Sequence, residues 1–553
     1  MCILVSEKAQ QDRIPAQESI SQRHTGWRQA GAKTEVGKSL QVRLRRFGLG
    51  ALALFFLVSL AACHAGPPYV RPSVQVPASY KELQSPAPQG SPIWKESAPK
   101  DDMVRGRWWE AFNDTLLNKL EEKVDISNQN ISAAAASYLA ARAAVREARS
   151  HYYPTVGGNP EITNSRPSPG QFGGLRATGL SNTELSVTSY TNYSLPATAS
   201  WEPDLWSRLR LETRTNYLAA QVSAADLESV RLAAHAELAV DYYELRGQDT
   251  LKQLLDSTVD NYREALDLVQ AQYKAGMSNE EAVASAETQL RAAEAQDTNI
   301  GILRAQYEHA ISLLVGQPAS EFSLGPQPLD ASPPRTPVGI PSDLLERRPD
   351  VAAAERAVAE SNAQIGLART AFFPRLLLGA SGGFGNSSIS DWFTWPARFW
   401  AVGPELTHTV FDAGSRRATV DQAQAANDRT VANYRQTVLT AFRQVEDQLA
   451  SLRILSLSIQ QQDAAVRSAK RNLEEATARY KAGLDPYLNV ITAQTLLLNT
   501  EQTAITFRVQ QMVANVRLIE ALGGGWNSSQ MPSPHELETK PPRSPSVGSN
   551  HPR

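Results

Sequence analysis

Paired carboxylates, histidines and cysteines are the residues of this chain that could do chemistry, and their spacing decides which chemistry is open to them. The adjacent acids Asp101-Asp102 and Glu280-Glu281 could form acid/base pairs, but in polar stretches such acids are more often solvated helix ends. The eight histidines show no metal-ligand spacing, and the chain has no phosphate loop, nucleophile elbow or dinucleotide fingerprint. With 55 basic and 57 acidic residues and no basic cluster, nothing suggests nucleic acid. We predict no enzyme, no metal site and no nucleic-acid partner.

Cys63 is the residue best placed for covalent modification. It ends the run Leu60-Ala61-Ala62-Cys63, after an apolar stretch that begins at Phe47 and is preceded by arginines. This order is typical of a secretory signal, and the stretch is short for a membrane-spanning helix. The run resembles a bacterial lipobox, so we expect cleavage before Cys63, which would then carry a diacylglycerol and an N-acyl chain. The alternative is an ordinary signal peptide with an incidental cysteine.

Two further expectations concern this end of the chain. His64 follows the cysteine where an aspartate would mark another destination, which favours sorting to the outer membrane. The residues before Arg43 are polar and without pattern, so we expect the true start near Val42. If Cys2 is lost with the leader, the mature chain has one cysteine and no disulfide.

The elements that must carry the function are duplicated. Three segments recur in the second half of the chain in the same order: Ala148-Arg149 with Tyr153-Pro154 as Ala368-Arg369 with Phe373-Pro374, Asp204-x-x-Ser207-Arg208 as Asp412-x-x-Ser415-Arg416, and Tyr273-Lys274-Ala275-Gly276 as Tyr480-Lys481-Ala482-Gly483. A repeat of this size indicates a duplicated half-domain rather than a short solenoid unit.

Each half contains a stretch that predicts a very long helix, from Asp204 to Gly276 and from Asp412 to Gly483. Neither stretch contains proline, and at 1.5 Å per residue each helix would extend roughly 100 Å. Apolar residues recur at three- and four-residue steps, which is typical of a coiled-coil-like seam. A glycine ends each stretch, and a return helix should follow from about Asn279 to Leu314 and from about Tyr487 to Leu522. We therefore expect two helical hairpins that pack on each other and on other subunits.

Strand-like segments precede each long helix. They run from Pro154 to about Ser168, Tyr190 to Trp201, Phe373 to Ser387 and Ala397 to Phe411. Apolar residues alternate in them, as in a sheet with one apolar face. After the signal no stretch is apolar enough for a spanning helix, so a membrane crossing would need a closed barrel. Four strands are too few to close one, whereas three chains would supply twelve. The alternative is a soluble β-hairpin that caps the helices.

The chain resembles the TolC-type outer-membrane efflux channels, in particular their lipidated OprM/NodT-like branch. The resemblance extends from about Pro67 to Trp526. The segments that carry it are Gly66-Pro67-Pro68-Tyr69, Arg107-Trp108-Trp109-Glu110-Ala111-Phe112 with Asp114, Ala148-Arg149 with Tyr153-Pro154, Trp201-Glu202-Pro203-Asp204-Leu205-Trp206, Pro341 to Asp350 with the motif Leu-Leu-x-Arg-Arg-Pro-Asp, and Ala521-Leu522-Gly523-Gly524-Gly525-Trp526.

The resemblance implies a mainly α fold with a small β part. Duplicated helical hairpins would form a trimeric α-barrel through the periplasm, and four strands per chain would contribute to a 12-stranded outer-membrane β-barrel. It also implies a passive homotrimer that exports small molecules or drugs. An inner-membrane RND-type pump would supply the energy, and a periplasmic adaptor would join pump and channel.

The resemblance also implies roles for residues at the hairpin turns. Gly276, Met277, Gly483 and Leu484, with Ala275 and Ala482, are the expected adaptor contacts, although a plain turn is an equal alternative. Leu488 and Thr492 match the positions that narrow the periplasmic end, where an apolar ring closes a pore by excluding water. Thr492 stands where relatives have an acidic residue, which puts cation binding there in doubt. Asp485 could replace that acid, but a helix cap is the favoured interpretation.

The predicted organisation has six segments. These are a leader and signal peptide (1–62), an N-terminal extension and equatorial segment (63–115), a first repeat (116–316), a proline-rich equatorial linker (317–341), a second repeat (342–526) and a disordered tail (527–553).

Three other functions stay open on the sequence. A periplasmic adaptor is also lipidated, but it would have one hairpin and no duplicated strand pair. A coiled-coil tether of the cell envelope would lack strands. A type I secretion duct for proteins would use the same conduit, and the lipidated branch favours small-molecule cargo over it.

Overall fold

Two helices of 67 residues dominate the fold, α4 (Arg208–Lys274) and α8 (Ser415–Lys481). The computed structural model describes residues 66–83, 94–96, 106–166, 189–334, 336–338 and 341–539. The leader, Cys63 and the end of the tail lie outside these residues. The return helices α5 (Glu280–Leu314) and α9 (Tyr487–Ala521) are each 35 residues long. The predicted long and return helices are therefore confirmed, with ends that differ by a few residues.

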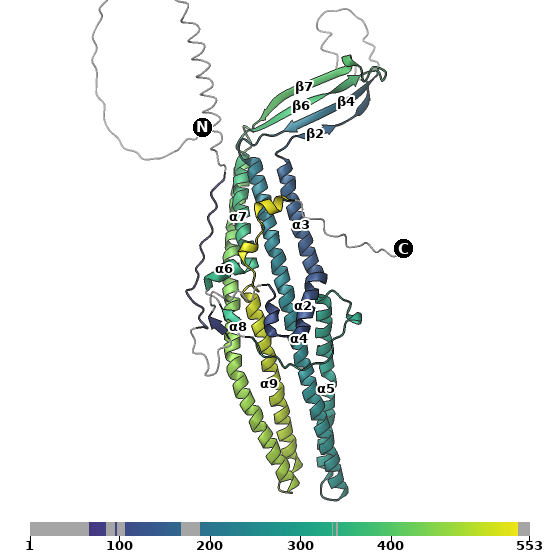
Figure 1. The fold of residues 1–553 in the computed structure, drawn as a ribbon, viewed down its shortest axis with the longest axis vertical. Coiled ribbons are helices and arrows are strands. Elements are labelled where there is room, and N and C mark those ends of the chain that lie inside the picture. The colour runs from purple at the N-terminus through teal and green to yellow at the C-terminus, as the bar shows by residue number, and fades with distance from the viewer. Residues whose placement is uncertain are drawn as a thin grey trace, which may run out of the picture. The chain divides into compact units, whose positions relative to one another are not determined.

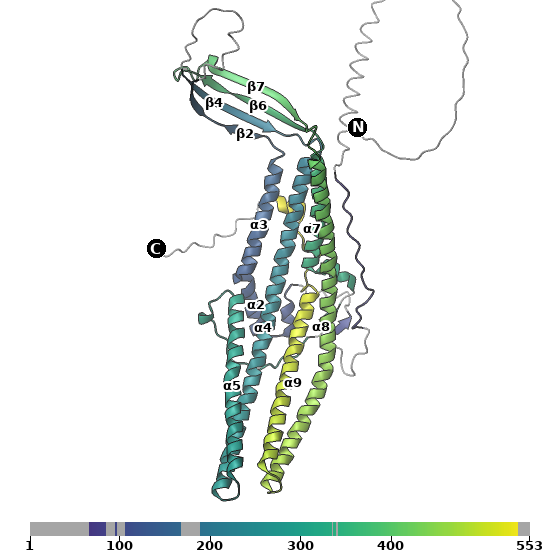
Figure 2. The same ribbon diagram turned by 180° about the vertical axis from the view of Figure 1, so that it is seen from behind.

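The helices pair into two antiparallel hairpins, α4 with α5 and α8 with α9, which lie beside each other (Figures 1 and 2). Their seam is apolar: Tyr242, Tyr243 and Leu245 of α4 are fully buried. Near the turns, Tyr487 and Val490 of α9 join a cluster with apolar residues of α4 and α5. The two hairpins of one chain thus pack on each other, as the sequence predicts.

Small residues let the helices approach closely. Ala220, Ala236 and Ala239 of α4 are fully buried, and a Cβ added at Gly247 would lie 2.6 Å from a methyl group of Val509 on α9. Such contact distances leave no room for a larger side chain.

Shorter helices lead into the sheet from both repeats. They are α2 (Thr115–Ser127), α3 (Gln129–Ser150), α6 (Leu344–Arg347) and α7 (Pro349–Thr370). Asn128 separates α2 from α3, because its side chain caps α3 by accepting hydrogen bonds from the amides of Asn130 and Ile131. In the second repeat, Pro349 at the first position of α7 makes the equivalent break.

The main sheet is antiparallel and lies at the end of the helices opposite the hairpin turns (Figures 1 and 2). Its strands, in spatial order, are β2 (Thr155–Gly158) with β3 (Glu161–Ser165), β4 (Tyr190–Trp201), β6 (Arg375–Asn386) and β7 (Arg398–Thr407). All four predicted strand segments are confirmed. The first is interrupted at Asn159-Pro160, although β2 and β3 pair with β4 in one continuous register. A second, parallel pair joins β1 (Trp94–Glu96) to β5 (Thr336–Val338).

Both ends of the described chain pack against the helices. Gly66 contacts Gly366 of α7, Tyr80 is buried, and Glu82 accepts hydrogen bonds from Arg453 of α8. The predicted disorder of the tail is wrong for residues 527–539. They form a 3₁₀ turn (Ser528–Gln530) and the short helix α10 (Pro534–Glu538), because Leu537 is buried beside Val145 and Ala220.

None of the helices in the described ranges is both long enough and apolar enough to span a membrane.

Candidate functional site

The two hairpin turns have the same backbone geometry. Gly276 and Gly483 have φ angles of +74° and +73°, in the left-handed region that glycine enters at little cost. Behind them, the amide of Met277 donates to the carbonyl of Gln272 at 2.8 Å, and that of Leu484 to Arg479 at 3.0 Å. This hydrogen-bond pattern ends a helix and reverses the chain. The predicted glycine stops are confirmed in both repeats.

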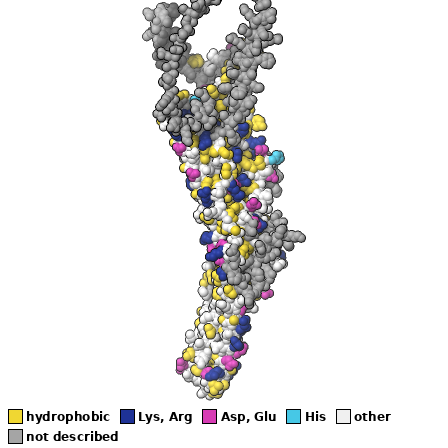
Figure 3. Space-filling model, turned by 90° about the vertical axis from the view of Figure 1, so that its left-hand side faces the viewer, with side chains coloured by type: hydrophobic (Ala, Val, Ile, Leu, Met, Phe, Trp, Pro, Cys, Tyr) yellow, Lys and Arg dark blue, Asp and Glu magenta, His cyan; other side chains and the backbone are white. Residues whose placement is uncertain are grey.

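The turns expose apolar side chains to solvent. Met277 is 75% exposed and Leu484 is 69% exposed, and the residues before each glycine, Ala275 and Ala482, are also exposed. Figure 3 shows hydrophobic side chains at this end of the molecule beside charged ones. The Tyr480 hydroxyl donates to Gln272, which ties the two turns together. The four predicted contact residues therefore form two neighbouring exposed tips.

Asp485 does not cap α9, which corrects the interpretation favoured from the sequence. The cap position is Pro486, and the Asp485 carboxylate accepts from Arg479 at 2.6 and 3.2 Å. The Arg479 guanidinium holds the pKa of Asp485 below its usual range. The equivalent turn of the first repeat uses Asn279, whose side chain caps α5.

Leu488 and Thr492 lie one turn apart on an exposed face of α9. Leu488 is 65% exposed, and the Thr492 hydroxyl donates to the Leu488 carbonyl at 2.9 Å. The structure therefore places both predicted gate residues together, close to the Gly483 turn. Their role in a gate stays a prediction.

The strand register gives the main sheet one apolar face. Residues directly opposite one another in an antiparallel pair share a face. Trp201 pairs with Leu378, which pairs with Pro404, and the face continues through Val156, Tyr193, Leu195, Ala197, Ala199, Leu376, Ala380, Phe384, Trp400, Val402 and Leu406. The other face carries mostly small and polar residues, with Leu377 and Phe399 as apolar exceptions; examples are Thr155, Ser194, Thr198, Ser200, Ser381, Gly383, Glu405 and Thr407.

The apolar face of the sheet is exposed, and both edges of the sheet are unpaired. Trp400 is 80% exposed, and every residue of β7 is exposed. Within the described chain, β7 pairs only with β6, and β2 and β3 pair only with β4. An apolar face exposed to water and unpaired strand edges are typical of surfaces that a membrane or another chain covers.

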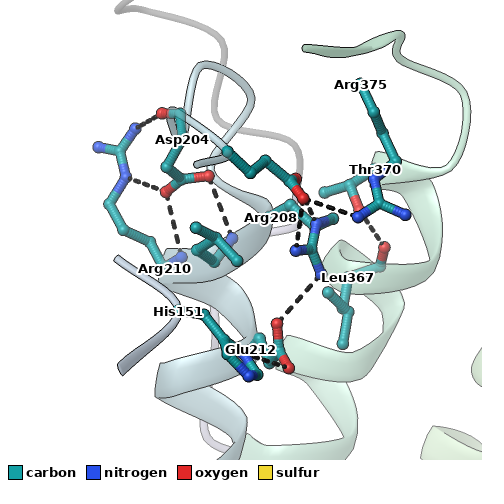
Figure 4. Close-up of polar contacts among 10 residues, drawn as sticks. His151, Asp204, Arg208, Arg210, Glu212, Leu367, Thr370 and Arg375 are labelled. Carbon is teal, nitrogen blue, oxygen red and sulfur yellow. Dashed lines mark hydrogen bonds and ion pairs between the residues drawn. The ribbon is translucent and has the colours of Figure 1, made fainter. Parts of the chain in front are cut away.

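A network of ion pairs joins the sheet to the helices and is drawn in Figure 4. Arg208, at the start of α4, donates to Glu202 at 2.8 and 3.1 Å and to Glu212 at 3.1 Å. Arg375, at the start of β6, donates to the same Glu202 at 2.7 Å. The network therefore fastens the first repeat to the second where the sheet begins.

The repeated Asp-x-x-Ser-Arg motif starts each long helix. Ser207 has a φ of +63°, so the cap is supplied by the Asp204 carboxylate, which accepts from the amides of Leu209 and Arg210. In the second repeat, Asp412 accepts from the amide of Arg416 at 3.1 Å. The sequence singled out this motif as a repeat, and the structure assigns it to helix initiation.

Two of the motifs that carry the family resemblance hold the helices together. Trp108, Trp109 and Phe112 are buried against α4. Arg348 of the Leu-Leu-x-Arg-Arg-Pro-Asp motif donates to the carbonyl of Ala521 at the end of α9 and pairs with Asp350. These residues hold the helices together and are not part of an exposed site.

Sequence reasoning missed a buried polar cluster between α2 and α4. His235 lies 2.7 Å from a Glu121 oxygen and 3.3 Å from an Asp125 oxygen, and it stacks on Trp109. Burial raises the pKa of Glu121 to about 7. In the part of the chain that the structure describes, no group of three His, Cys, Asp or Glu side chains is arranged to hold a metal ion. Only the pairing of α2 with α4 brings these residues together, so no spacing could have revealed them.

Comparison with known proteins identifies relatives that match most of the chain. A family model described as outer membrane efflux protein matches residues 122–317 and 340–524, more than half of the chain. The solvent efflux pump outer membrane protein SrpC and the toluene efflux pump outer membrane protein TtgI, both from Pseudomonas putida, are each 31% identical over 485 residues, which cover 87% of this chain and 99% of theirs. The pyoverdine export outer membrane protein OpmQ of Pseudomonas aeruginosa is 28% identical over 85% of this chain and 96% of its own.

Two solved structures have the same fold. The outer-membrane channel OprN has a TM-score of 0.75 and 27% identity, over 84% of this chain and 100% of OprN. CusC has a TM-score of 0.72 and 25% identity, over 83% of this chain and 99% of CusC. By sequence and by fold, this chain belongs to the outer membrane efflux protein family.

Proposed function

We propose that this protein is the outer-membrane channel of a tripartite efflux system and works as a passive homotrimer. The observation that carries the proposal is the main sheet, with its exposed apolar face and two edges that no described strand pairs with. Four strand positions are too few to close a barrel, whereas three copies joined edge to edge supply twelve. The apolar face would then contact lipid, and the face of small and polar residues would line the pore.

The helices would continue the conduit below the sheet. The α4–α5 and α8–α9 hairpins pair within each chain. Three copies would stand side by side in a closed ring and cover the exposed faces of their neighbours. Leu488 and Thr492, on the exposed face of α9, would narrow this ring near the turns. A ring of leucines excludes water from a narrow pore and so closes it without any charged group.

The turns are the proposed contact with a periplasmic adaptor. Met277 and Leu484 present exposed apolar side chains at neighbouring tips, beside the turns at Gly276 and Gly483. An inner-membrane RND-type pump would supply the energy through that adaptor. The family is one of transport proteins, and we propose that this member catalyses no reaction and needs no cofactor beyond lipid.

A lipid anchor at Cys63 fits the position of the first described residues. Gly66 packs against Gly366 and beside Leu211, close to the end of α7 and the start of α4 where the sheet begins. Three residues span at most about 10 Å, so acyl chains on Cys63 would lie near that level. They would insert into the leaflet nearest the helices.

Relatives favour small-molecule cargo. SrpC and TtgI are named for solvent and toluene efflux, and OpmQ is named for pyoverdine export. We infer that this channel passes small organic molecules, with the choice among them made by the pump.

Chemical cross-linking followed by planar-bilayer recording tests the proposal. The detergent-purified protein should cross-link as a trimer and conduct in discrete, passive steps. A monomer that conducts neither as the natural chain nor as Leu488→Ala would contradict the channel, because the substitution should open a closed gate.

A further inference from the structure

One arginine, Arg398 at the start of β7, lies on the apolar face of the main sheet. Arg398 pairs with Phe384, which pairs with Leu195, so the guanidinium group emerges on the apolar face. The other charged residues in the described strands of this sheet, Glu161, Arg375 and Glu405, lie on the opposite face. A charge on an apolar face is costly unless it has an anionic partner.

The connection between β6 and β7, residues 387–397, extends the apolar face beyond the strands. Trp392 packs against Tyr193 with ring centroids 5.5 Å apart, and Phe393 against Phe384 at 5.8 Å. Both partners belong to the apolar face of the sheet. Trp395, in the turn just before Arg398, is 73% exposed. Amphipathic aromatic rings of this kind are typical of the boundary between lipid tails and water.

Local contacts hold the Arg398 side chain through Nε and leave both Nη groups without an acceptor among the described residues. Its Nε donates to the Trp395 carbonyl at 2.8 Å, and its guanidinium carbon lies over the Trp395 ring. A guanidinium that is fixed through Nε presents its Nη groups as a fork, which matches the spacing of phosphate oxygens.

The position of Arg398 in the fold indicates which anionic group it would meet. Residues 387–397 lie at the end of the sheet farthest from the helices (Figure 1). If the helices extend into the periplasm, as in the proposed function on which this inference rests, that end lies at the outer leaflet. Phosphorylated glycolipid forms that leaflet in outer membranes. We propose that Arg398 and the aromatic residues around it bind the phosphate group of this glycolipid.

Native mass spectrometry of the full-length protein in detergent tests the site, with bisphosphorylated lipid A as the probe. Arg398→Gln should weaken lipid A binding about tenfold, because it removes a charge-assisted hydrogen bond from a lipid-facing site. Arg398→Lys should retain part of the affinity, since it keeps the charge and loses the fork. Arg435→Gln on α8 is the matched control, an exposed arginine outside the sheet, and should bind like the natural protein.

Two further probes decide what is recognised. Lipid A without phosphates should bind the natural protein and Arg398→Gln equally, and phosphatidylglycerol should bind more weakly than bisphosphorylated lipid A. Equal lipid A binding by the natural protein and Arg398→Gln would overturn the proposal, and so would phosphatidylglycerol binding as tightly as lipid A. If Arg398→Gln forms a conducting trimer and keeps its lipid A affinity, this site alone is refuted. If the natural protein forms no trimer, the proposed channel is refuted.

Discussion

At the scale of single residues, the buried acid Asp241 on α4 contributes to the response of the fold to pH. Burial raises the pKa of Asp241 to about 7, the nearby acids Glu237 and Glu244 act in the same direction, and Arg517 opposes them. The folded state therefore holds a proton on this acid more tightly than the unfolded chain does. Its contribution to stability is complete below the unfolded pKa of about 4 and is lost as the pH rises through about 7.

Asp241→Asn should remove this dependence, since asparagine does not ionise. Relative to the natural protein, the variant should gain about 1–3 kcal/mol of stability as the pH is raised from about 4 to about 8. Thermal unfolding followed by tryptophan fluorescence at both pH values measures the difference. Asp260→Asn, an exposed acid on the same helix, is the control and should keep the natural slope. An unchanged slope in Asp241→Asn would show that this acid titrates normally.

Leu488 is the residue whose side chain should limit conductance. Replacing it with alanine widens and wets an apolar constriction, so single-channel conductance of Leu488→Ala should rise several-fold, roughly as expected when a dewetted gate opens. Leu496→Ala, at another exposed leucine two turns further along α9, is the matched control and should change conductance little. Equal conductance of both variants and the natural channel would remove Leu488 from the gate.

At the scale of elements, three glycines distinguish the effect of backbone conformation on stability from the effect of steric contact. A Cβ at Gly276, Gly483 or Gly301 would meet no atom within 4 Å, but only the first two have positive φ. Gly276→Ala and Gly483→Ala should therefore each cost about 1–2 kcal/mol through backbone strain. Gly301→Ala, inside α5, should instead stabilise by up to about 1 kcal/mol. Hydrogen exchange at the turns and thermal unfolding should show that Gly276→Ala and Gly483→Ala lower the stability and that Gly301→Ala raises it. A stability change of the same sign in all three variants would contradict this account.

The long elements could be predicted from the sequence because their signals are strong and local. Period-3.6 apolar residues, the lack of proline and the glycines at 276 and 483 determine both hairpins. Alternation determined the strands, including the face that carries Leu376 and Leu378. The break at Asn128 and the short helix at Leu537 escaped prediction, because each depends on a capping side chain or on a contact with a distant helix.

Those parts of the candidate site that have a local signal could also be predicted from the sequence. The tips and the pair Leu488 and Thr492 follow from the turn and from family resemblance, whereas Arg398 attracts attention only when the strand register shows which face it occupies. Asp485 was misjudged as a cap, since the sequence gives no sign that Arg479 lies close enough to bind it.

At the scale of the whole molecule, the N-terminal segment joins the sheet-proximal end of the helices to the middle of α8. A Cβ at Gly366 would lie 2.9 Å from the Cα of Gly66 and 3.3 Å from a Leu211 methyl group. Gly366→Val should therefore lift residues 66–83 from α7 and make their amides exchange faster, by about tenfold or more for a loss of 1–2 kcal/mol. Gly301→Val, at an open helical position, should leave that segment protected. Unchanged exchange in Gly366→Val would mean that the segment is held by its other contacts, such as Glu82 with Arg453.

The pairing of β4 with β6 also sets an order of folding. Each helical hairpin closes through a turn of a few residues, but β4 finds β6 only after most of the chain has been made, since Trp201 pairs with Leu378. Closing so long a loop costs entropy and slows assembly. The α4–α5 hairpin can therefore form early, while the sheet exists only as the separate groups β2, β3 and β4, and β6 and β7. A continuous apolar face arises only when β4 meets β6, which shortens the time that the complete face spends in water.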